Sequence, residues 1–196
     1  MQDDQDAPRL TRAERRAARL ARQKQIEQRY RKDRQRNVLA QPGCHDFVFV
    51  LDHLKAGFNV PKIFRSAQAF GAAAIHLVNI GVFDTAPAKG AFRKVPARFH
   101  DRFEEAHQAL TAEGYTLIAL TADGAESLPG AELPRRSAFV VGNEEFGLSF
   151  DPADYPEMRT LRIPLYGRME SLNASVAAAI VMYEYVRQHG GGEAGS

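Results

Sequence analysis

Three short segments place polar side chains beside apolar runs, and these segments could carry chemistry. The first, residues 58–66, reads FNVPKIFRS and puts the amide of Asn59 and the guanidinium of Arg65 on one predicted helix. A guanidinium in such a place can hold a phosphate and stabilise a developing negative charge. The structural alternative is a helix cap followed by a surface arginine.

The second segment, residues 142–149, reads GNEEFGLS and follows a buried strand directly. Ligands of α/β proteins bind beyond the carboxyl ends of the strands, and glycines there let a ligand approach the backbone. The segment is neither a phosphate-binding P-loop nor a dinucleotide fingerprint, because it lacks both Gly-Lys-Ser/Thr and G-x-G-x-x-G. The structural alternative is a glycine turn that carries the solvated carboxylates of Glu144 and Glu145.

The third segment, residues 161–175, reads LRIPLYGRMESLNAS. A strand ends at Pro164, and the chain then loops into an apolar helix for which Ser171 is the predicted N-cap. Capping by Ser171 leaves Asn173 unexplained, because Asn173 is a polar residue in the first turn of that helix. This segment is therefore also a candidate part of a site.

Apolar runs define the elements that must position these segments. Continuous β-rich runs are typical of strands that are buried on both faces. Alternation of such strands with helices predicts an α/β domain with a mostly parallel sheet and helices on both faces. The predicted strands are 47–51, 74–78, 115–120, 138–141 and 160–163, and the predicted helices are about 59–70, 101–113 and 172–188.

Two of these helices have informative patterns. In 59–70, Asn59 is the predicted N-cap, Gly71 can end the helix, and Arg65 lies away from the apolar stripe, so its side chain should point out of the core. Residues 174–183 are apolar nearly all round, which predicts burial on every side by the fold or by a partner subunit.

Charge divides the chain into two parts. Residues 1–36 hold 12 Lys/Arg and 6 Asp/Glu, whereas residues 37–196 hold 14 and 18. Thr11 and Glu14 fit a capping box, which predicts a basic helical arm whose apolar stripe is too thin for a core face, with Ile26 and Tyr30 isolated. The arm is either a solvated helix or disordered tail, or a segment for an anionic partner such as nucleic acid. Charge alone does not distinguish RNA, DNA and lipid.

Composition narrows the class of protein. The 196 residues suit one domain with an appendage. Cys44 is the only cysteine, which excludes an intrachain disulfide, a multi-cysteine zinc site and a ligated iron–sulfur cluster. No run of about 18 apolar residues is present, and the polar start of the chain lacks a secretion signal, so we expect a cytoplasmic protein with no membrane association. The six histidines show no metal-ligand spacing, so no metal is expected.

Taken together, the three segments resemble one family over about residues 46–188. Asn-x5-Arg, then G-N-E-x-x-G-L-S, then I-P-x6-S-L-N-x-S-x-A is similar to the SpoU/TrmH type of the SPOUT superfamily. The resemblance implies an RNA 2′-O-ribose methyltransferase with a C-terminal trefoil knot, S-adenosylmethionine as cofactor, tRNA or rRNA as substrate, and a homodimer. The charge division places a basic arm at 1–40 before a domain at 41–190, which the resemblance implies is knotted, and the Gly/Ser-rich composition of 191–196 predicts a disordered tail. Pro61 and Glu145 depart from the family pattern, without removing a chemical group.

The same resemblance assigns roles to individual residues. It implies that Arg65, Asn59, Glu144, Ser171 and Asn173 form the catalytic set. It implies that the cofactor pocket is lined by Thr121, Gly142, Asn143, Ile163 and Leu172, largely through backbone groups. Two other classes of function remain open, namely a catalytically silent RNA-binding protein of the same fold and an α/β protein that binds a ligand other than RNA.

Overall fold

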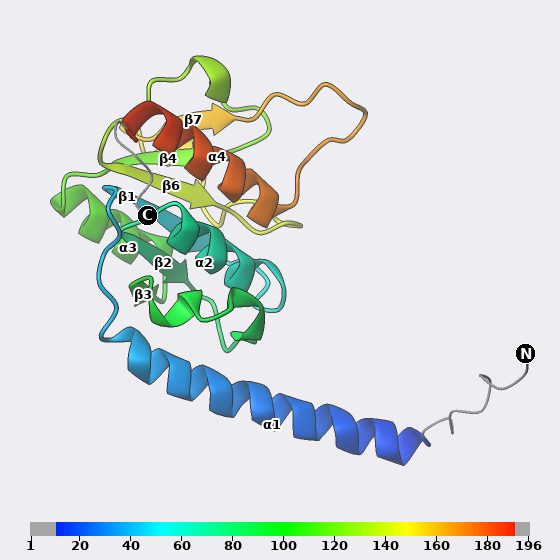
Figure 1. Ribbon diagram of the computed structural model, residues 1–196. Coiled ribbons are helices and arrows are strands. Elements are labelled where there is room, and N and C mark those ends of the chain that lie inside the picture. Colours follow the sequence, from blue (N-terminus) through cyan, green and yellow to red (C-terminus); the bar gives the residue numbers. More distant parts are fainter. Residues whose placement is uncertain (1–10, 191–196) are drawn as a thin grey trace, which may run out of the picture.

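Seven parallel strands form one sheet in the computed structural model, which describes residues 11–190 (Figure 1). The strand order is β3-β2-β1-β6-β4-β7-β5, and every pairing between these strands is parallel. The strands are β1 Phe47–Asp52, β2 Ala74–Val78, β3 Ala97–His100, β4 Thr116–Leu120, β5 Glu126–Ser127, β6 Ser137–Val141 and β7 Arg159–Arg162. The five predicted strands are confirmed to within two residues, and β3 and β5 were not predicted.

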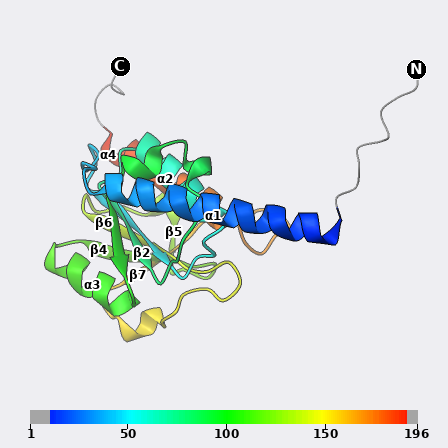
Figure 2. The same ribbon diagram turned by 90° about the horizontal axis from the view of Figure 1, so that it is seen from below.

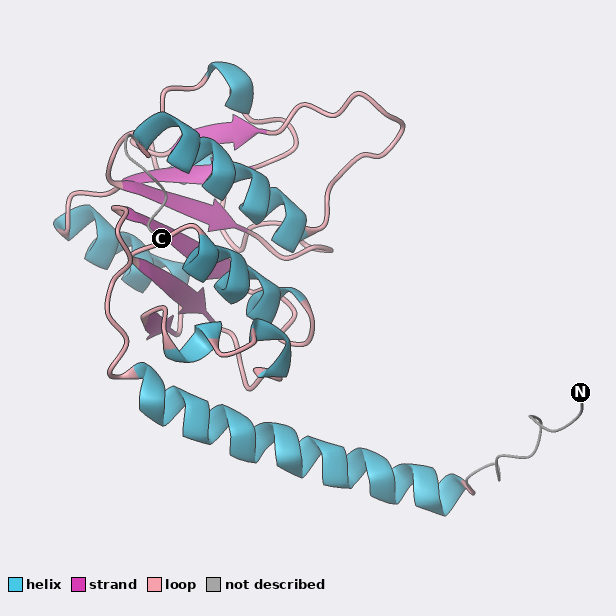
Figure 3. Ribbon diagram, viewed as in Figure 1, coloured by secondary structure: helices cyan, strands magenta, loops and turns pink. Residues whose placement is uncertain are grey.

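Helices cover both faces of this sheet, as predicted (Figure 3). Alternate side chains of β1 show the division, because Phe47, Phe49 and Leu51 join one core cluster and Val48 and Val50 the other. The first cluster packs under α1, α2 and α4, and the second packs under α3. The four helices are α1 Arg12–Asn37, α2 Asn59–Ala69, α3 Phe103–Ala112 and α4 Ala174–His189.

The starts of α2 and α4 differ from the prediction. Asn59 is the first residue within α2, Phe58 is the N-cap, and no side chain caps this helix. At α4 the N-cap is Asn173, whose side-chain oxygen accepts a hydrogen bond from the Ser175 amide, so the prediction of Ser171 as cap was wrong. Asn173 is polar because it caps the helix. The end of α2 follows the prediction, since Gly71 has a φ of 66°.

The fold of the single chain does not bury α4 on every side, so burial by a partner subunit stays a prediction. One side packs against α2 and the sheet through residues such as Ala178, Val181 and Met182. The other side exposes Val176, Ile180 and Tyr183, which follow one another at helical spacing. The apolar pattern of this helix therefore includes a face that the single chain leaves in solvent.

The first helix is partly docked on the body. Its capping box is confirmed, with Thr11 and Glu14 each satisfying the other's backbone amide. Tyr30 is only 4% exposed and packs against Phe83 and Phe92, so the interpretation of Tyr30 as isolated was wrong. Residues 11–25 are exposed throughout, and they extend beyond the body (Figure 2).

The tail at 191–196, which its Gly/Ser-rich composition predicts to be disordered, lies outside the described residues. Within residues 11–190 no helix is long and apolar enough to cross a membrane.

Candidate active site

A cavity of about 1150 Å³ opens where β4, β6 and β7 end. Its walls come from the loops after these three strands and from the start of α4. All five residues predicted to hold a cofactor line it, namely Thr121, Gly142, Asn143, Ile163 and Leu172. Three of the five predicted catalytic residues also line it, namely Glu144, Ser171 and Asn173. The fold thus brings the second and third segments together around one space.

The loop of residues 142–149 is held in a tight turn. Asn143 and Gly147 exchange two backbone hydrogen bonds, and the Asn143 side-chain oxygen accepts bonds from the amides of Glu145 and Phe146. A Cβ on Gly142 would lie 2.5 Å from the carbonyl of Gly147, so only glycine fits there. The side chain of Asn143 therefore shapes the loop, and its amide nitrogen donates to the His53 carbonyl, 2.7 Å away.

Asp52 anchors the far end of this loop, and the sequence interpretation missed it. It is fully buried at the end of β1 and accepts hydrogen bonds from the backbone amide and the hydroxyl of Ser149, at 2.6 and 2.9 Å. His53 Nδ1 lies 2.8 Å from the same carboxylate. An aspartate at the end of an apolar run was the available signal, because a buried carboxylate needs hydrogen-bond partners.

Asn59 reaches the loop from α2. Its side-chain amide donates a hydrogen bond to Glu144 Oε1, which joins the first and second segments. Asn59 is buried, and its Oδ1 has no hydrogen-bond partner within residues 11–190. An unpaired buried acceptor lowers the free energy of unfolding by about 1–3 kcal/mol. Asn59 is therefore a position that destabilises the folded protein.

A second contact joins the segment between β1 and α2 to the 142–149 loop, and this contact is exposed to solvent. Lys55 Nζ is 2.6 Å from Glu145 Oε2. The hydrogen bond to Glu145 raises the pKa of the Lys55 ammonium above its ordinary value. Glu145, which departs from the family pattern, therefore ties the 142–149 loop to the segment that precedes α2.

Arg65 is a predicted catalytic residue that does not line the cavity. It is exposed on α2, as its position off the apolar stripe predicted. Its guanidinium makes no hydrogen bond or ion pair with any residue between 11 and 190. It is consequently available to a group outside the described chain.

The opposite wall of the cavity comes from β7 and the loop after β4. The Thr121 amide donates to the Leu161 carbonyl, 3.1 Å away, and Arg162 donates to the carbonyl of Gly124 at 2.6 Å. A Cβ on Gly124 would lie 2.5 Å from the backbone carbon of Leu161. The two segments are thus in close backbone contact, which leaves Thr121 and Ile163 at the rim of the same space. In the described part of the chain no three His, Cys, Asp or Glu side chains are grouped so that they could bind a metal ion.

Comparisons with known proteins agree with this arrangement. The model of the SpoU rRNA Methylase family matches residues 46–183. An uncharacterized tRNA/rRNA methyltransferase of Synechocystis is 32% identical over 148 residues, which are 73% of this chain and 38% of the relative. The tRNA (guanosine(18)-2′-O)-methyltransferase of Thermus thermophilus is 28% identical over 73% of this chain and 75% of the relative.

A solved structure shows the same fold. It is the SpoU methyltransferase AviRb from Streptomyces viridochromogenes in complex with AdoMet, with a TM-score of 0.68 and 26% identity. The match covers 78% of this chain and 61% of that one. This chain therefore spans only part of several proteins that it resembles. Because the family model covers most of the chain and all three segments, the chain belongs to the SpoU rRNA methylase family.

Proposed function

We propose that this protein transfers a methyl group from S-adenosylmethionine to a ribose 2′-hydroxyl of a structured tRNA or rRNA. One observation carries the proposal: the second and third segments enclose a single cavity, and Asn59 of the first segment is bonded to Glu144 in its wall. The relatives support it, since the Thermus enzyme is named for 2′-O-methylation of tRNA and AviRb was solved with AdoMet.

The cavity suits this cofactor. Its volume is sufficient for a nucleoside-sized ligand, since such sites span about 300–1000 Å³. The walls combine apolar side chains, such as Leu120, Leu148 and Leu172, with backbone at the ends of three strands. Ile163 and Leu172 would pack against the adenosine, and the backbone around Gly142 would approach it closely. When bound, the sulfonium of the cofactor supplies the methyl group.

The side chains around the cavity would prepare the ribose. A 2′-hydroxyl is a poor nucleophile until its proton leaves, and as the ribose oxygen takes the methyl group that proton would pass to solvent water. The planar, cationic guanidinium of arginine suits phosphate oxygens and developing negative charge, so we assign Arg65 to the adjacent phosphate and the developing alkoxide. The Asn59–Glu144 hydrogen bond would fix the carboxylate at the mouth of the cavity. Ser171, which is exposed and lines the cavity, would contact the ribose, while Asn173 holds the start of α4 in place.

A second copy of the chain belongs to the proposal. Arg65 does not line the cavity of its own chain, and the exposed face of α4 carries Val176, Ile180 and Tyr183. An isologous dimer would cover this face, because two-fold dimers are the commonest assemblies. We likewise propose the trefoil knot, the division into a 1–40 arm and a 41–190 domain, and a cytoplasmic location.

The test is methyl transfer to RNA from cells that lack this protein, with mapping of the 2′-O-methylated nucleotide. We expect the wild type to restore one modification and Arg65→Ala to reduce its rate at least 100-fold. Gln68→Ala, at another exposed position of α2, is the matched control and should be fully active.

Calorimetry with S-adenosylmethionine separates the alternatives. Both variants should bind it as the wild type does, since Arg65 does not line the cavity. A folded protein that binds no cofactor contradicts the proposal. Cofactor binding without methylation of any RNA points to a catalytically silent RNA-binding protein.

A further inference from the structure

The second half of α1 is fixed on the body by contacts of several kinds. The ring of Tyr30 stacks on Phe92 at 5.8 Å between centroids and meets Phe83 edge-on at 5.2 Å. The buried Asn37 side chain donates to the carbonyls of Phe92 and Val95 and accepts from the Ala97 amide. A helix held by an aromatic cluster and by three hydrogen bonds at its end keeps one direction relative to the body.

Polar contacts also fix how the second half of α1 is rotated about the helix axis. Arg29 pairs with Asp84 at 2.8 Å, Asp33 accepts a hydrogen bond from Thr85 and lies 3.7 Å from Arg93, and the Arg34 guanidinium lies 4.2 Å from the centre of the Phe99 ring. These contacts set which side of α1 faces the body.

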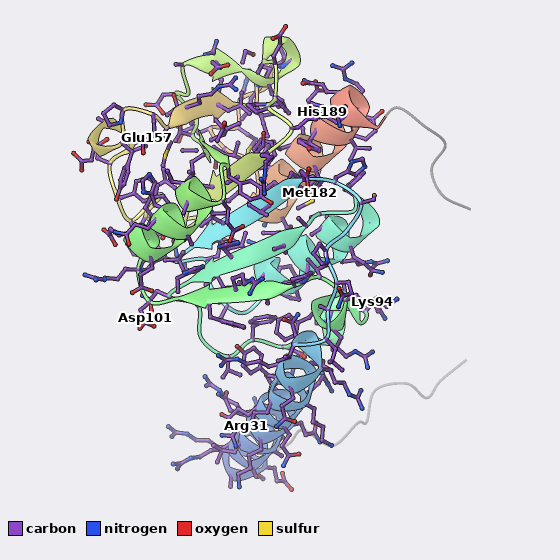
Figure 4. All side chains as sticks on the ribbon, turned by 90° about the vertical axis from the view of Figure 1, so that its left-hand side faces the viewer. Arg31, Lys94, Asp101, Glu157, Met182 and His189 are labelled. Carbon is purple, nitrogen blue, oxygen red and sulfur yellow. The ribbon has the colours of Figure 1, made fainter. Side chains whose placement is uncertain are left out.

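The free half, residues 11–25, carries six basic residues and one acidic residue. Glu14 is that acidic residue, and its carboxylate is occupied by the capping box. No side chain of this half is buried. Figure 4 shows the side chains of α1 spread around the helix below the body. Such a charge density repels itself unless an anion lies close to it.

The arginines of the free half share one side of the helix. At about 100° per residue they lie within an arc of about 120°, and the direction of Tyr30 falls inside that arc. We call these five residues the arginine stripe: Arg12, Arg15, Arg16, Arg19 and Arg22. The stripe therefore faces the same way as the docked side of α1, but beyond the edge of the body.

The stripe projects on the side of the molecule where the strands end. In Figure 1 the arrowheads of β6 and β7 point toward the side on which the blue start of α1 extends, and in Figure 2 α1 extends past the body. The free half rises about 20 Å along its axis at 1.5 Å per residue. The free half and the strand ends that carry the cavity therefore lie toward the same side of the molecule.

We propose that the arginine stripe is a rigid wall that binds the phosphates of the RNA strand flanking the target nucleotide and so sets which ribose reaches the cavity. This inference rests on the proposed function and adds a substrate requirement. A good RNA substrate must extend beyond the modified nucleotide far enough to lie along the stripe, on a free half that is about 20 Å long. Residues 37–196 have a net charge of −4, so the body offers little general attraction for RNA.

A helical-phase experiment tests the rigid direction of the stripe. Two alanines inserted between Gln25 and Ile26 turn the stripe by about 200°, whereas four alanines turn it by about 40°. Both insertions keep every charge and every contact between the docked half and the body, and they remove only the exposed hydrogen bond from Gln23 to Glu27. We expect the two-residue insertion to lower kcat/KM for RNA at least 10-fold and the four-residue insertion to lower it less than threefold. Equal activity of the two variants would overturn the proposal.

A second experiment measures RNA binding alone, so it stays informative if methylation is never observed. Arg16→Ala with Arg19→Ala removes two charges from the stripe, and Arg31→Ala with Lys32→Ala removes two exposed charges that face away from the body. Binding to bulk tRNA and bulk rRNA is measured across a salt series. The stripe variant should flatten the log–log slope by roughly 1.5–2, and the control by less than 0.5. Equal slopes, or binding of the stripe to anionic vesicles in preference to RNA, would overturn the proposal.

Discussion

Asn59 and Glu144 lie 85 residues apart in the chain and are joined by a hydrogen bond from the Asn59 amide to a carboxylate oxygen of Glu144. The bond links the start of α2, after β1, to the loop after β6, and β1 and β6 are neighbours in the sheet. Because parallel strands place their carboxyl ends at one edge, two segments distant in sequence meet there. The remaining acceptor of Asn59 is buried and unpartnered within residues 11–190.

Exchanging the amide and the carboxylate between positions 59 and 144 tests the role of their hydrogen bond. The bond either only holds the 142–149 loop in place or also contributes to methyl transfer. Asn59→Asp puts a carboxylate beside Glu144, and two carboxylates in contact raise the pKa of one of them. We expect Asn59→Asp to lower the free energy of unfolding by about 1–3 kcal/mol. The double variant Asn59→Asp, Glu144→Gln restores one donor and one acceptor, so stability should return.

Urea unfolding and methyl-transfer rates for both single variants and the double variant give the coupling between the two positions. We expect the double variant to recover stability but not methyl-transfer activity, because its carboxylate lies at position 59 and no longer at position 144. Strictly additive losses of stability would show that the two side chains do not interact in solution.

The exposed apolar face of α4 leads to a prediction about assembly. Val176, Ile180 and Tyr183 are 47%, 36% and 62% exposed in the single chain. Ile180→Glu would place a charge in the centre of the proposed interface. Sedimentation at tens of micromolar should show a dimer for the wild type and a monomer for this variant. Gln108→Glu, with the same charge change on an exposed position of α3, should remain dimeric. A monomeric wild type would remove the dimer from the proposal.

Most strands could be predicted from the sequence because burial on both faces leaves a continuous apolar run, as at residues 47–51 of β1. β3 escaped because Arg98 and His100 interrupt its apolar character, and β5 has only two residues. Local patterns cannot show contacts between distant segments. The sequence pattern left Tyr30 isolated because its partners lie more than 50 residues away, Phe83 in a loop and Phe92 in a short 3-10 helix.

The candidate site was predictable to a different degree in each segment. Residues of the second and third segments were assigned by motif, and the fold places them around one cavity. The N-cap of α4 was misassigned because Ser171 and Asn173 are both good caps and only the observed backbone decides between them. Asp52 was passed over because its hydrogen-bond partner Ser149 is 97 residues away.

Docking of α1 predicts an uneven effect of substitutions along that helix. Tyr30→Ala should lower the free energy of unfolding by about 3 kcal/mol, since it leaves a cavity between Phe83 and Phe92. Leu20→Ala, at a position 56% exposed, should change it by less than about 0.5 kcal/mol. Urea unfolding followed by circular dichroism provides the measurement. If the two variants were equally stable, α1 would not be docked in solution, and a deletion of the whole helix would leave the body unaffected.

The pair formed by the buried His76 on β2 and the half-buried His100 on β3 predicts a loss of stability in acid. The two rings stack at 5.1 Å, and His76 Nδ1 lies 3.0 Å from His100 Nε2. Burial, reinforced by the charges of His100 and Arg98, lowers the pKa of His76 to about 3, and burial lowers the pKa of His100 as well. The unfolded chain binds a proton at His76 near pH 6.5, whereas the folded chain does so only near pH 3.

The sign of the pH effect follows from these pKa values. Between about pH 6.5 and pH 3 the unfolded state holds more protons, so the free energy of unfolding decreases as the pH falls, by about 1.4 kcal/mol per pH unit for His76 alone. His76→Gln removes this titration, so its stability should depend less steeply on pH than that of the wild type. Urea unfolding of both proteins at pH 7, 6, 5 and 4.5 measures the two slopes. Parallel curves would mean that His76 is already accessible to protons in the native protein.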